Sequence, residues 1–249
     1  MKRIFLMDGK RGLLSIGFYL GIVLAAAAGI LGMGEMLEYI AGTMLPEGEM
    51  RCVSALYMAL SSEGLTYILP VACTMAMSGA YIDDLQSGTL PYIILRTTKR
   101  RYHASKMLNC AVFGALSVLG AVVLMAVIFG MMFPPEGMEI QNFHLENMGY
   151  LLERILILCL NGSFFALLGG AVAAAVNNRY MAYAAPFILY YVLSTLFAAY
   201  LSDYPLINPK EWMLLQVSGE GVVTGILLAV NVAAAICYLL VMERRWKHE

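Results

Sequence analysis

The sequence contains unusually few charged residues. Only 13% of its 249 residues are charged and 61% are hydrophobic, whereas a soluble domain carries about 25% charged residues. The mean hydropathy of +0.74 points the same way. The net charge of −1 gives no reason to expect a nucleic-acid partner. We therefore expect an integral membrane protein in which residues 1–249 form a single transmembrane domain.

The cysteines carry no motif in their spacing. Four of the five cysteines (Cys73, Cys110, Cys159 and Cys237) lie inside apolar runs. No CxxC pair and no Cys/His metal spacing occurs. We interpret these cysteines as small packing residues and predict no metal site and no disulfide framework.

Six apolar runs are long enough to cross a bilayer as helices. They cover residues 13–33, 65–82, 107–133, 155–176, 181–201 and 222–242. The predicted fold is all-α with six transmembrane helices, and Pro70 predicts a kink in the second. The alternative for the first run, a secretory signal peptide, is disfavoured because 21 residues exceed the usual length of its apolar region.

The positive charges predict the orientation of these helices. Six spans place both ends of the chain on one side, and thirteen of the sixteen Lys and Arg residues fall on that side. Only Arg51, Arg154 and Lys210 do not. By the positive-inside rule the N- and C-termini are cytoplasmic. We expect a multi-pass protein of a bacterial cell membrane.

Ionisable residues are absent from all six predicted spans, which contain no Asp, Glu, Lys, Arg or His. Ion-coupled carriers, proton pumps and intramembrane proteases need such groups inside the membrane. We therefore predict no catalytic residues. The phosphate-binding pattern GxxxxGK[ST] is missing too. If ATP drives this protein, ATP and Mg²⁺ bind a partner ATPase, and this chain carries no cofactor.

The loop between the second and third spans, residues 83–106, is the most informative stretch. It holds five of the sixteen Lys and Arg residues. Gly88 supplies a turn, Thr89 can cap a helix, and Pro91 suits a first helical turn. A short helix over residues 91–95 is therefore expected. For the basic residues alone, contact with lipid headgroups on the positive side is the simpler explanation.

At these residues the sequence resembles the ABC-2 family of ABC-transporter permeases. Such permeases carry an acidic residue, then Gly-Thr-Leu, an apolar stretch, a Ser-Arg-like pair and a lysine. Here Asp84 precedes Gly88-Thr89-Leu90 by four residues. Thr98-Lys99 replaces the pair, and Lys106 follows seven residues after Lys99. The six-span plan extends the resemblance over the whole chain.

The sequence departs from the family pattern at three positions of the same loop. Gln86 replaces a frequent second acid, Pro91 stands where Glu is common, and Arg96 stands where Pro is common. These departures affect the start of the expected helix and its polar contacts.

The resemblance implies a permease subunit of an ATP-driven exporter. Its partners would be an ABC ATPase, a second permease subunit and membrane lipid, and the short cytoplasmic helix would be the coupling helix. The implied contacts with the ATPase are Asp84, Gly88, Thr89, Leu90, Tyr92, Ile93, Arg96 and Lys99. An alternative function is a membrane-bound immunity or sensor protein that binds a peptide without moving it. A membrane enzyme is a third.

Polar and aromatic residues inside the spans are candidates for a substrate path. They are Tyr67, Thr74, Ser78, Tyr183, Tyr190 and Asn231. Hydrogen bonds between helices are the simpler explanation for the same residues. Because no span carries a fixed charge, the expected cargo is amphipathic or hydrophobic: a peptide, a lipid-like molecule or a drug.

Two local patterns predict packing and a helix start. Small residues, Gly162 and the Ala166-x-x-x-Gly170 pattern, indicate close helix contact along the fourth span. Asn208, followed by proline and then by Glu211, forms a capping box, so a short helix should run to about residue 216. Its Trp212 and Met213 suit a membrane interface.

Overall fold

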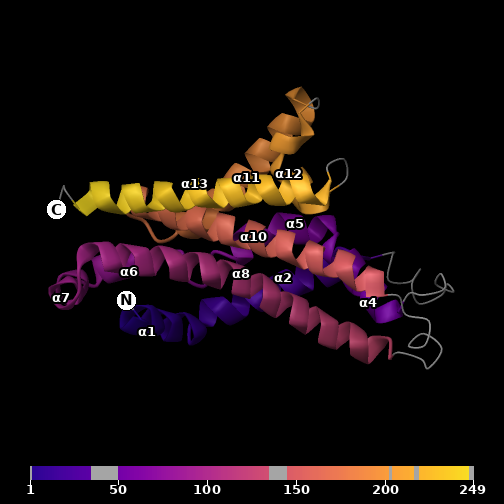
Figure 1. The fold of residues 1–249 in the computed structure, drawn as a ribbon, viewed down its shortest axis with the longest axis horizontal. Coiled ribbons are helices and arrows are strands. Elements are labelled where there is room, and N and C mark those ends of the chain that lie inside the picture. Colours follow the sequence, from indigo (N-terminus) through magenta and orange to yellow (C-terminus); the bar gives the residue numbers. More distant parts are fainter. Residues whose placement is uncertain (1, 35–49, 135–144, 202–203, 216–218, 247–249) are drawn as a thin grey trace.

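A computed structural model describes residues 2–34, 50–134, 145–201, 204–215 and 219–246. Within these ranges the chain is helical and contains no strand. The long helices lie side by side along the longest axis of the molecule (Figure 1). The start of α1, the short helix α7 and the end of α13 lie at one end of the bundle, hereafter the α7 end.

The helices follow the chain in a simple order. Their bounds are α1 Lys2–Leu13, α2 Ile16–Leu31, α4 Arg51–Leu60, α5 Glu63–Ala72, α6 Ala80–Gln86, α7 Leu90–Arg96, α8 Lys99–Met132, α10 Leu145–Val176, α11 Met181–Tyr200, α12 Pro209–Leu214 and α13 Glu220–Trp246, with a 3-10 turn η1 at Pro205–Ile207.

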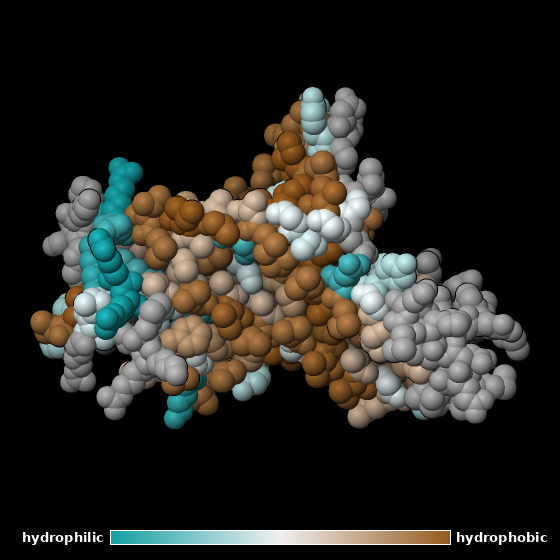
Figure 2. All heavy atoms as spheres, in the orientation of Figure 1, coloured by the Kyte–Doolittle hydropathy of each residue, from teal (hydrophilic) through white to brown (hydrophobic). Residues whose placement is uncertain are grey.

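Four of the described helices, α8, α10, α11 and α13, are long and apolar enough to cross a membrane. Two helix pairs pass the same test only when taken together. The α1–α2 pair is bent by 57° and the α4–α5 pair by 64°. The described residues thus hold four to six candidate spans, as a multi-pass membrane protein requires. Figure 2 shows apolar surface along the middle of the molecule and hydrophilic residues at the α7 end.

The predicted second span, residues 65–82, is not one kinked helix. Instead α5 ends at Ala72, residues 73–79 form turns, and α6 begins at Ala80. Pro70 lies inside α5, so the break comes after the proline rather than at it. The carbonyl groups of the break pack against α2, where a Cβ added at Gly17 would overlap Met75 O. This tertiary contact explains why the break has no simple local signal.

Small residues bring α8 and α10 into close contact, as the sequence predicts. A Cβ added at Gly114 would lie 2.5 Å from Gly162 O and 2.7 Å from the Cβ of Ala166. The Ser163 hydroxyl donates to Ala111 O at 2.9 Å across the same crossing. Gly170, the last residue of the predicted pattern, instead packs against Tyr238 of α13. The fourth span is thus a central packing helix.

The cysteines are all free in the structure. Cys73, Cys110 and Cys159 are buried among apolar side chains, which confirms the packing interpretation for these three. Cys237 is exposed on α13.

The predicted capping box starts a helix where expected. The Asn208 side chain accepts from the Lys210 N–H at 3.0 Å, and Pro209 opens α12. The expectation that Trp212 and Met213 lie at a membrane interface is wrong. Both are buried, at 8% and 0% exposure, and the Trp212 indole donates to Leu206 O at 2.6 Å. A single sequence does not show that α12 folds back onto the bundle.

The close α8–α10 crossing yields a prediction with a control in the same helix. We expect Gly114→Ala to lower the free energy of unfolding by about 2 kcal/mol, because the added methyl group meets a backbone carbonyl. Gly130→Ala is the control, since nothing lies within 4 Å of its added Cβ. It should be neutral or stabilising, by up to about 1 kcal/mol. Denaturant unfolding in detergent measures both, and equal effects would contradict the crossing.

Candidate functional site

Six charged side chains meet at the α7 end, and we call this group the ion network. They come from α1, α6, α8 and the turn between α10 and α11. The members are Asp8, Arg11, Asp83, Asp84, Lys106 and Arg179. Three acids face three bases, so the group is electrically balanced.

Asp84 is the centre of the ion network and is only 2% exposed. Its Oδ1 accepts from Arg11 Nη1 at 2.5 Å. Its Oδ2 lies 2.7 Å from Lys106 Nζ and accepts from the Tyr102 hydroxyl at 2.8 Å. Burial alone would raise the pKa of this carboxyl group. The Lys106 charge and the hydrogen bonds from Lys106, Tyr102 and Arg11 outweigh burial and hold the pKa below its ordinary value.

Lys106 connects α8 to two other helices. Besides Asp84 on α6, its ammonium group donates to Asp8 Oδ1 on α1 at 2.8 Å. The other Asp8 oxygen accepts from the Ser105 hydroxyl at 3.3 Å. Lys106 is 2% exposed, and a buried ammonium needs such partners because an unpaired charge is costly. These contacts hold α1, α6 and α8 in a fixed arrangement.

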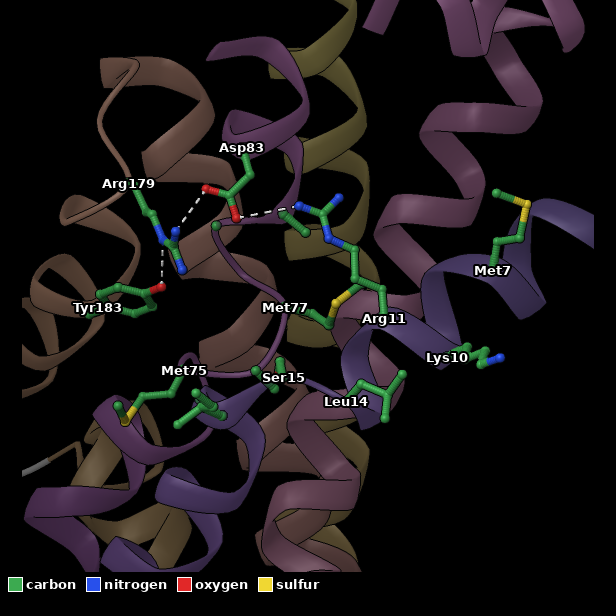
Figure 3. A pocket seen from close by; sticks show the side chains of 15 residues that line it. Met7, Lys10, Arg11, Leu14, Ser15, Met75, Met77, Asp83, Arg179 and Tyr183 are labelled. Carbon is green, nitrogen blue, oxygen red and sulfur yellow. Dashed lines mark hydrogen bonds and ion pairs between the residues drawn. The ribbon is translucent and has the colours of Figure 1, made fainter. Parts of the chain in front are cut away.

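Asp83 forms the outer and more exposed part of the network (Figure 3). It lies between two arginines: Oδ1 is 3.2 Å from Arg179 Nη1, and Oδ2 is 3.9 Å from Arg11 Nη2. Arg179 also donates from Nε to the Tyr183 hydroxyl at 3.1 Å. Both arginine side chains are about half exposed, so each pair stabilises the fold only weakly.

The backbone of Asp84 supports the turn that leads into α7. Its carbonyl oxygen accepts from the hydroxyls of Ser87 and Thr89, each at 3.3 Å. Gly88 adopts a left-handed φ of +67°, a conformation that favours glycine. The predicted capping by Thr89 does not occur, because its side chain makes no cap hydrogen bond to α7. The same residue that anchors the ion network therefore also shapes the turn before α7.

Helix α7 occupies the position predicted for the coupling helix, and it has two different faces. Leu90 is 2% exposed and belongs to the core, with Ile93 packed against that core. Tyr92 and Leu95 are 72% and 84% exposed. Lys99 is half-buried at the start of α8. The side chain of Arg96 lies outside the described residues.

A cavity of about 890 Å³ opens beside the ion network. Its walls come from the bend between α1 and α2, the non-helical segment 73–79, the start of α6, and the turn and first residues of α11. Figure 3 shows side chains of all these segments around it. The lining residues are Met7, Lys10, Arg11, Leu14, Ser15, Ile16, Gly17, Met75, Ala76, Met77, Gly79, Ala80, Asp83, Arg179 and Tyr183.

Of the six predicted substrate-path residues, Tyr183 lines this cavity. Thr74 and Ser78 are buried near it but donate to backbone carbonyl groups. Thr74 bonds Val71 O at 2.7 Å, and Ser78 bonds Ala166 O at 3.0 Å. Their hydroxyls thus serve the backbone of the break and its contact with α10.

The remaining path residues lie elsewhere in the bundle. Tyr67 and Tyr190 meet edge to face with ring centroids 6.2 Å apart, and Tyr190 is 1% exposed. Asn231 donates to Leu160 O at 3.0 Å, between α13 and α10. The six residues therefore do not form one continuous site in the described part of the chain, and their place on a substrate path stays a prediction.

Sequence reasoning missed five residues of the site: Asp8, Arg11, Asp83, Tyr102 and Arg179. One signal was present, since Asp8 is the single acid among the first twelve residues. Its pairing with a lysine 98 positions later cannot be read from spacing. No group of three or more metal-ligating side chains occurs among the residues that the structure describes.

The buried contacts of Lys106 yield a stability prediction. Lys106→Met leaves Asp8 and the buried Asp84 without their shared partner. We expect the free energy of unfolding to fall by about 3 kcal/mol. Arg100 is exposed at the start of the same helix. Arg100→Met should change the free energy of unfolding by less than about 0.5 kcal/mol. Similar losses in the two variants, measured in detergent, would show that the network does not stabilise the fold.

The lowered pKa of Asp84 predicts a pH dependence. A carboxyl group with a depressed folded-state pKa contributes stability above its ordinary pKa of about 3.9, and that stability is lost as the pH falls through the folded value. The stability difference between the wild type and Asp84→Asn should therefore be largest at neutral pH and shrink below about pH 4. Unfolding measured from pH 7 to pH 3 tests this, and a constant difference would contradict the assignment.

Comparison with known proteins adds no identification. No protein-family model matches the sequence, and a search of curated proteins finds no match. Inference about function therefore rests on the residues and geometry at the α7 end.

Proposed function

We propose that this chain is the transmembrane permease subunit of an ATP-driven exporter of the ABC-2 kind. A separate ABC ATPase would bind ATP and Mg²⁺, so this chain would not be an enzyme. It would lie in the cytoplasmic membrane of a bacterium with the α7 end in the cytoplasm. A second permease subunit, identical or related, would complete the transporter. The cargo would be an amphipathic or hydrophobic molecule.

The observation that carries this proposal is the two-faced character of α7. One side of this seven-residue helix is anchored by Leu90, while Tyr92 and Leu95 project outward with most of their surface exposed. A basic segment follows it directly. Exposed aromatic and aliphatic side chains on a small anchored helix are typical of a protein contact. The missing phosphate-binding motif gives that contact a natural partner, an ATPase.

The ion network supports a route by which force on α7 could reach the membrane. The turn before α7 bonds to the Asp84 backbone, and the Asp84 side chain bonds to α1 and α8. A displacement of α7 would therefore move α1, α6 and α8 together. The exposed Asp83–Arg179 pair is a weaker link to the α10–α11 turn. In this mechanism the close α8–α10 crossing acts as the pivot.

The direct test is purification of the tagged chain from native membranes in a mild detergent. The proposal expects an ABC ATPase to co-purify, identified by mass spectrometry, and the complex to hydrolyse ATP. Recovery of the chain without any ATPase, yet with a bound peptide, would favour an immunity or sensor protein. Turnover by the isolated chain would favour an enzyme. Either result would overturn the proposal.

The exposed face of α7 yields a prediction with a matched control. Tyr92→Asp should weaken ATPase binding at least 30-fold, because a central aromatic contact contributes about 2 kcal/mol or more. Tyr204→Asp is the control, since Tyr204 is 59% exposed and lies beyond α11, away from the α7 end. It should leave ATPase binding unchanged. Pull-down titrations compare the two, and equal losses would exclude α7 as the contact.

The turn before α7 yields a second prediction. Gly88→Val should reduce ATP turnover by the complex roughly 5- to 30-fold, since a left-handed backbone costs a non-glycine residue about 1–2 kcal/mol. Nothing lies within 4 Å of an added Cβ at this position, so the effect is one of backbone strain. Gly88→Asn should retain most activity, because Asn tolerates this conformation. Full ATPase binding and turnover in the valine variant would refute the role of the turn.

A further inference from the structure

The cavity at the bend between α1 and α2 carries a feature that the proposed function does not use. The two helices meet at 57°, and their junction forms one wall of the 890 Å³ space. In an amphipathic helix followed by a span, such a bend lies at the level of the lipid headgroups. With α1 taken as such a surface helix, the cavity would open where headgroups and acyl chains meet.

Positive charge dominates the polar lining of the cavity. Lys10, Arg11 and Arg179 face one acid, Asp83 (Figure 3). The Arg11 and Arg179 side chains are 51% and 54% exposed, so their free N–H groups are accessible to a ligand. Lys10 is exposed and forms no ion pair within the described part of the chain. The lining residues carry a formal charge of +2, which the buried Asp84 carboxylate beside Arg11 reduces to +1. Lys10 is thus the base that no acid of the ion network offsets.

The rest of the lining is apolar, and its most exposed members belong to the α1–α2 bend. Leu14 is 71% and Ile16 is 77% exposed, and Met7 on α1 is 71% exposed. Met75 and Met77 lie deeper, on the non-helical segment. Methionine adapts its shape to varied apolar ligands. A ligand that fits both the basic and the apolar part of the lining has an anionic group joined to an apolar tail.

We propose that this cavity binds the headgroup of an anionic phospholipid from the leaflet in which α1 lies. The phosphate would accept hydrogen bonds from Lys10, Arg11 and Arg179. The acyl chains would leave the cavity past Leu14 and Ile16. A soluble phosphate would satisfy the basic residues but leave this apolar exit uncovered. The site needs no ATPase, so its existence does not depend on the transport function.

The test measures lipid binding to the purified full-length chain after removal of lipid in a neutral detergent. Native mass spectrometry compares phosphatidylglycerol with phosphatidylcholine, and glycerol phosphate serves as the soluble anion. We expect phosphatidylglycerol to bind about tenfold more tightly than either of the others. Equal binding of the two lipids would overturn the anionic site. Equal binding of glycerol phosphate would overturn the role of the apolar exit.

Paired variants separate the cavity from the general positive charge of the α7 end. The double variant Lys10→Gln with Arg179→Gln should weaken phosphatidylglycerol binding about tenfold. Each basic residue near an anionic lipid contributes about fivefold to binding, and Asp83 already offsets part of the contribution of Arg179. The control combines Arg100→Gln with Arg101→Gln, which removes two exposed basic residues outside the cavity. It should change binding less than twofold. Equal losses in the two double variants would refute the site.

A third variant tests the space itself without changing charge. Met75→Trp places a larger side chain in the cavity wall and should reduce phosphatidylglycerol binding at least fivefold. Thermal unfolding and size-exclusion profiles report whether each variant keeps its fold. If the tryptophan variant does not fold, the charge pairs decide the question alone. Unchanged lipid binding in a folded Met75→Trp protein would overturn the cavity as the binding place.

Discussion

The contact on which the α7 end depends is the one between Asp84 and Lys106. Both side chains are 2% exposed, so each would carry a heavy desolvation cost without the other. Further partners offset this desolvation: Arg11 and Tyr102 contact the Asp84 carboxylate, and Asp8 contacts the Lys106 ammonium group. Every one of these partners comes from a helix that must then stay in place. The position of α1 against α6 and α8 follows from the need to keep two buried charges paired.

The strengths of the contacts around this pair are graded by burial. The Asp84 contacts are shielded from water and therefore little screened, whereas Asp83 and its two arginines are open to solvent. The buried contacts hold α1, α6 and α8 as one unit, and the exposed ones link that unit to the α10–α11 turn. This gradient suits a protein in which one group of helices moves relative to another, since the weaker link breaks first. It also leaves the outer arginines available to an anion in the cavity.

Local sequence signals predicted much of the fold, and tertiary contacts account for the rest. The short helix after Gly88 and the cap at Asn208 depend on neighbouring residues, and the structure has both. The last four predicted spans correspond to single helices long and apolar enough to cross a membrane, whereas the first two overlap bent helix pairs. The break at residues 73–79 packs against Gly17 of α2, which lies 58 positions before its contact residue Met75. Trp212 is buried because α12 returns to the bundle, which no local pattern shows.

The candidate site was predictable in outline but not in character. Asp84 was expected as a polar contact for a partner, whereas the structure buries it in the ion network. Tyr92, which was also expected as a contact, is exposed, and so is Leu95, which was not. Spacing predicted the turn and the short helix of this segment because turn and helix signals are local. Pairing of charges across 73 and 98 positions, as between Arg11 and Asp84 or Asp8 and Lys106, requires the folded chain.

Stability alone does not explain why such a network is buried. Apolar side chains of similar volume would hold α1, α6 and α8 together equally well or better. Charged groups instead fix the relative position of the helices, because a buried ion pair tolerates few alternative packings. Moving one partner away from the other costs free energy. That property is of little use in a passive anchor. In a protein driven from α7 it would make the helices respond together, since any displacement that separates Asp84 from Lys106 breaks a buried contact between opposite charges. The placement of this network directly behind the turn of α7 is therefore the arrangement expected if force enters the bundle at that end.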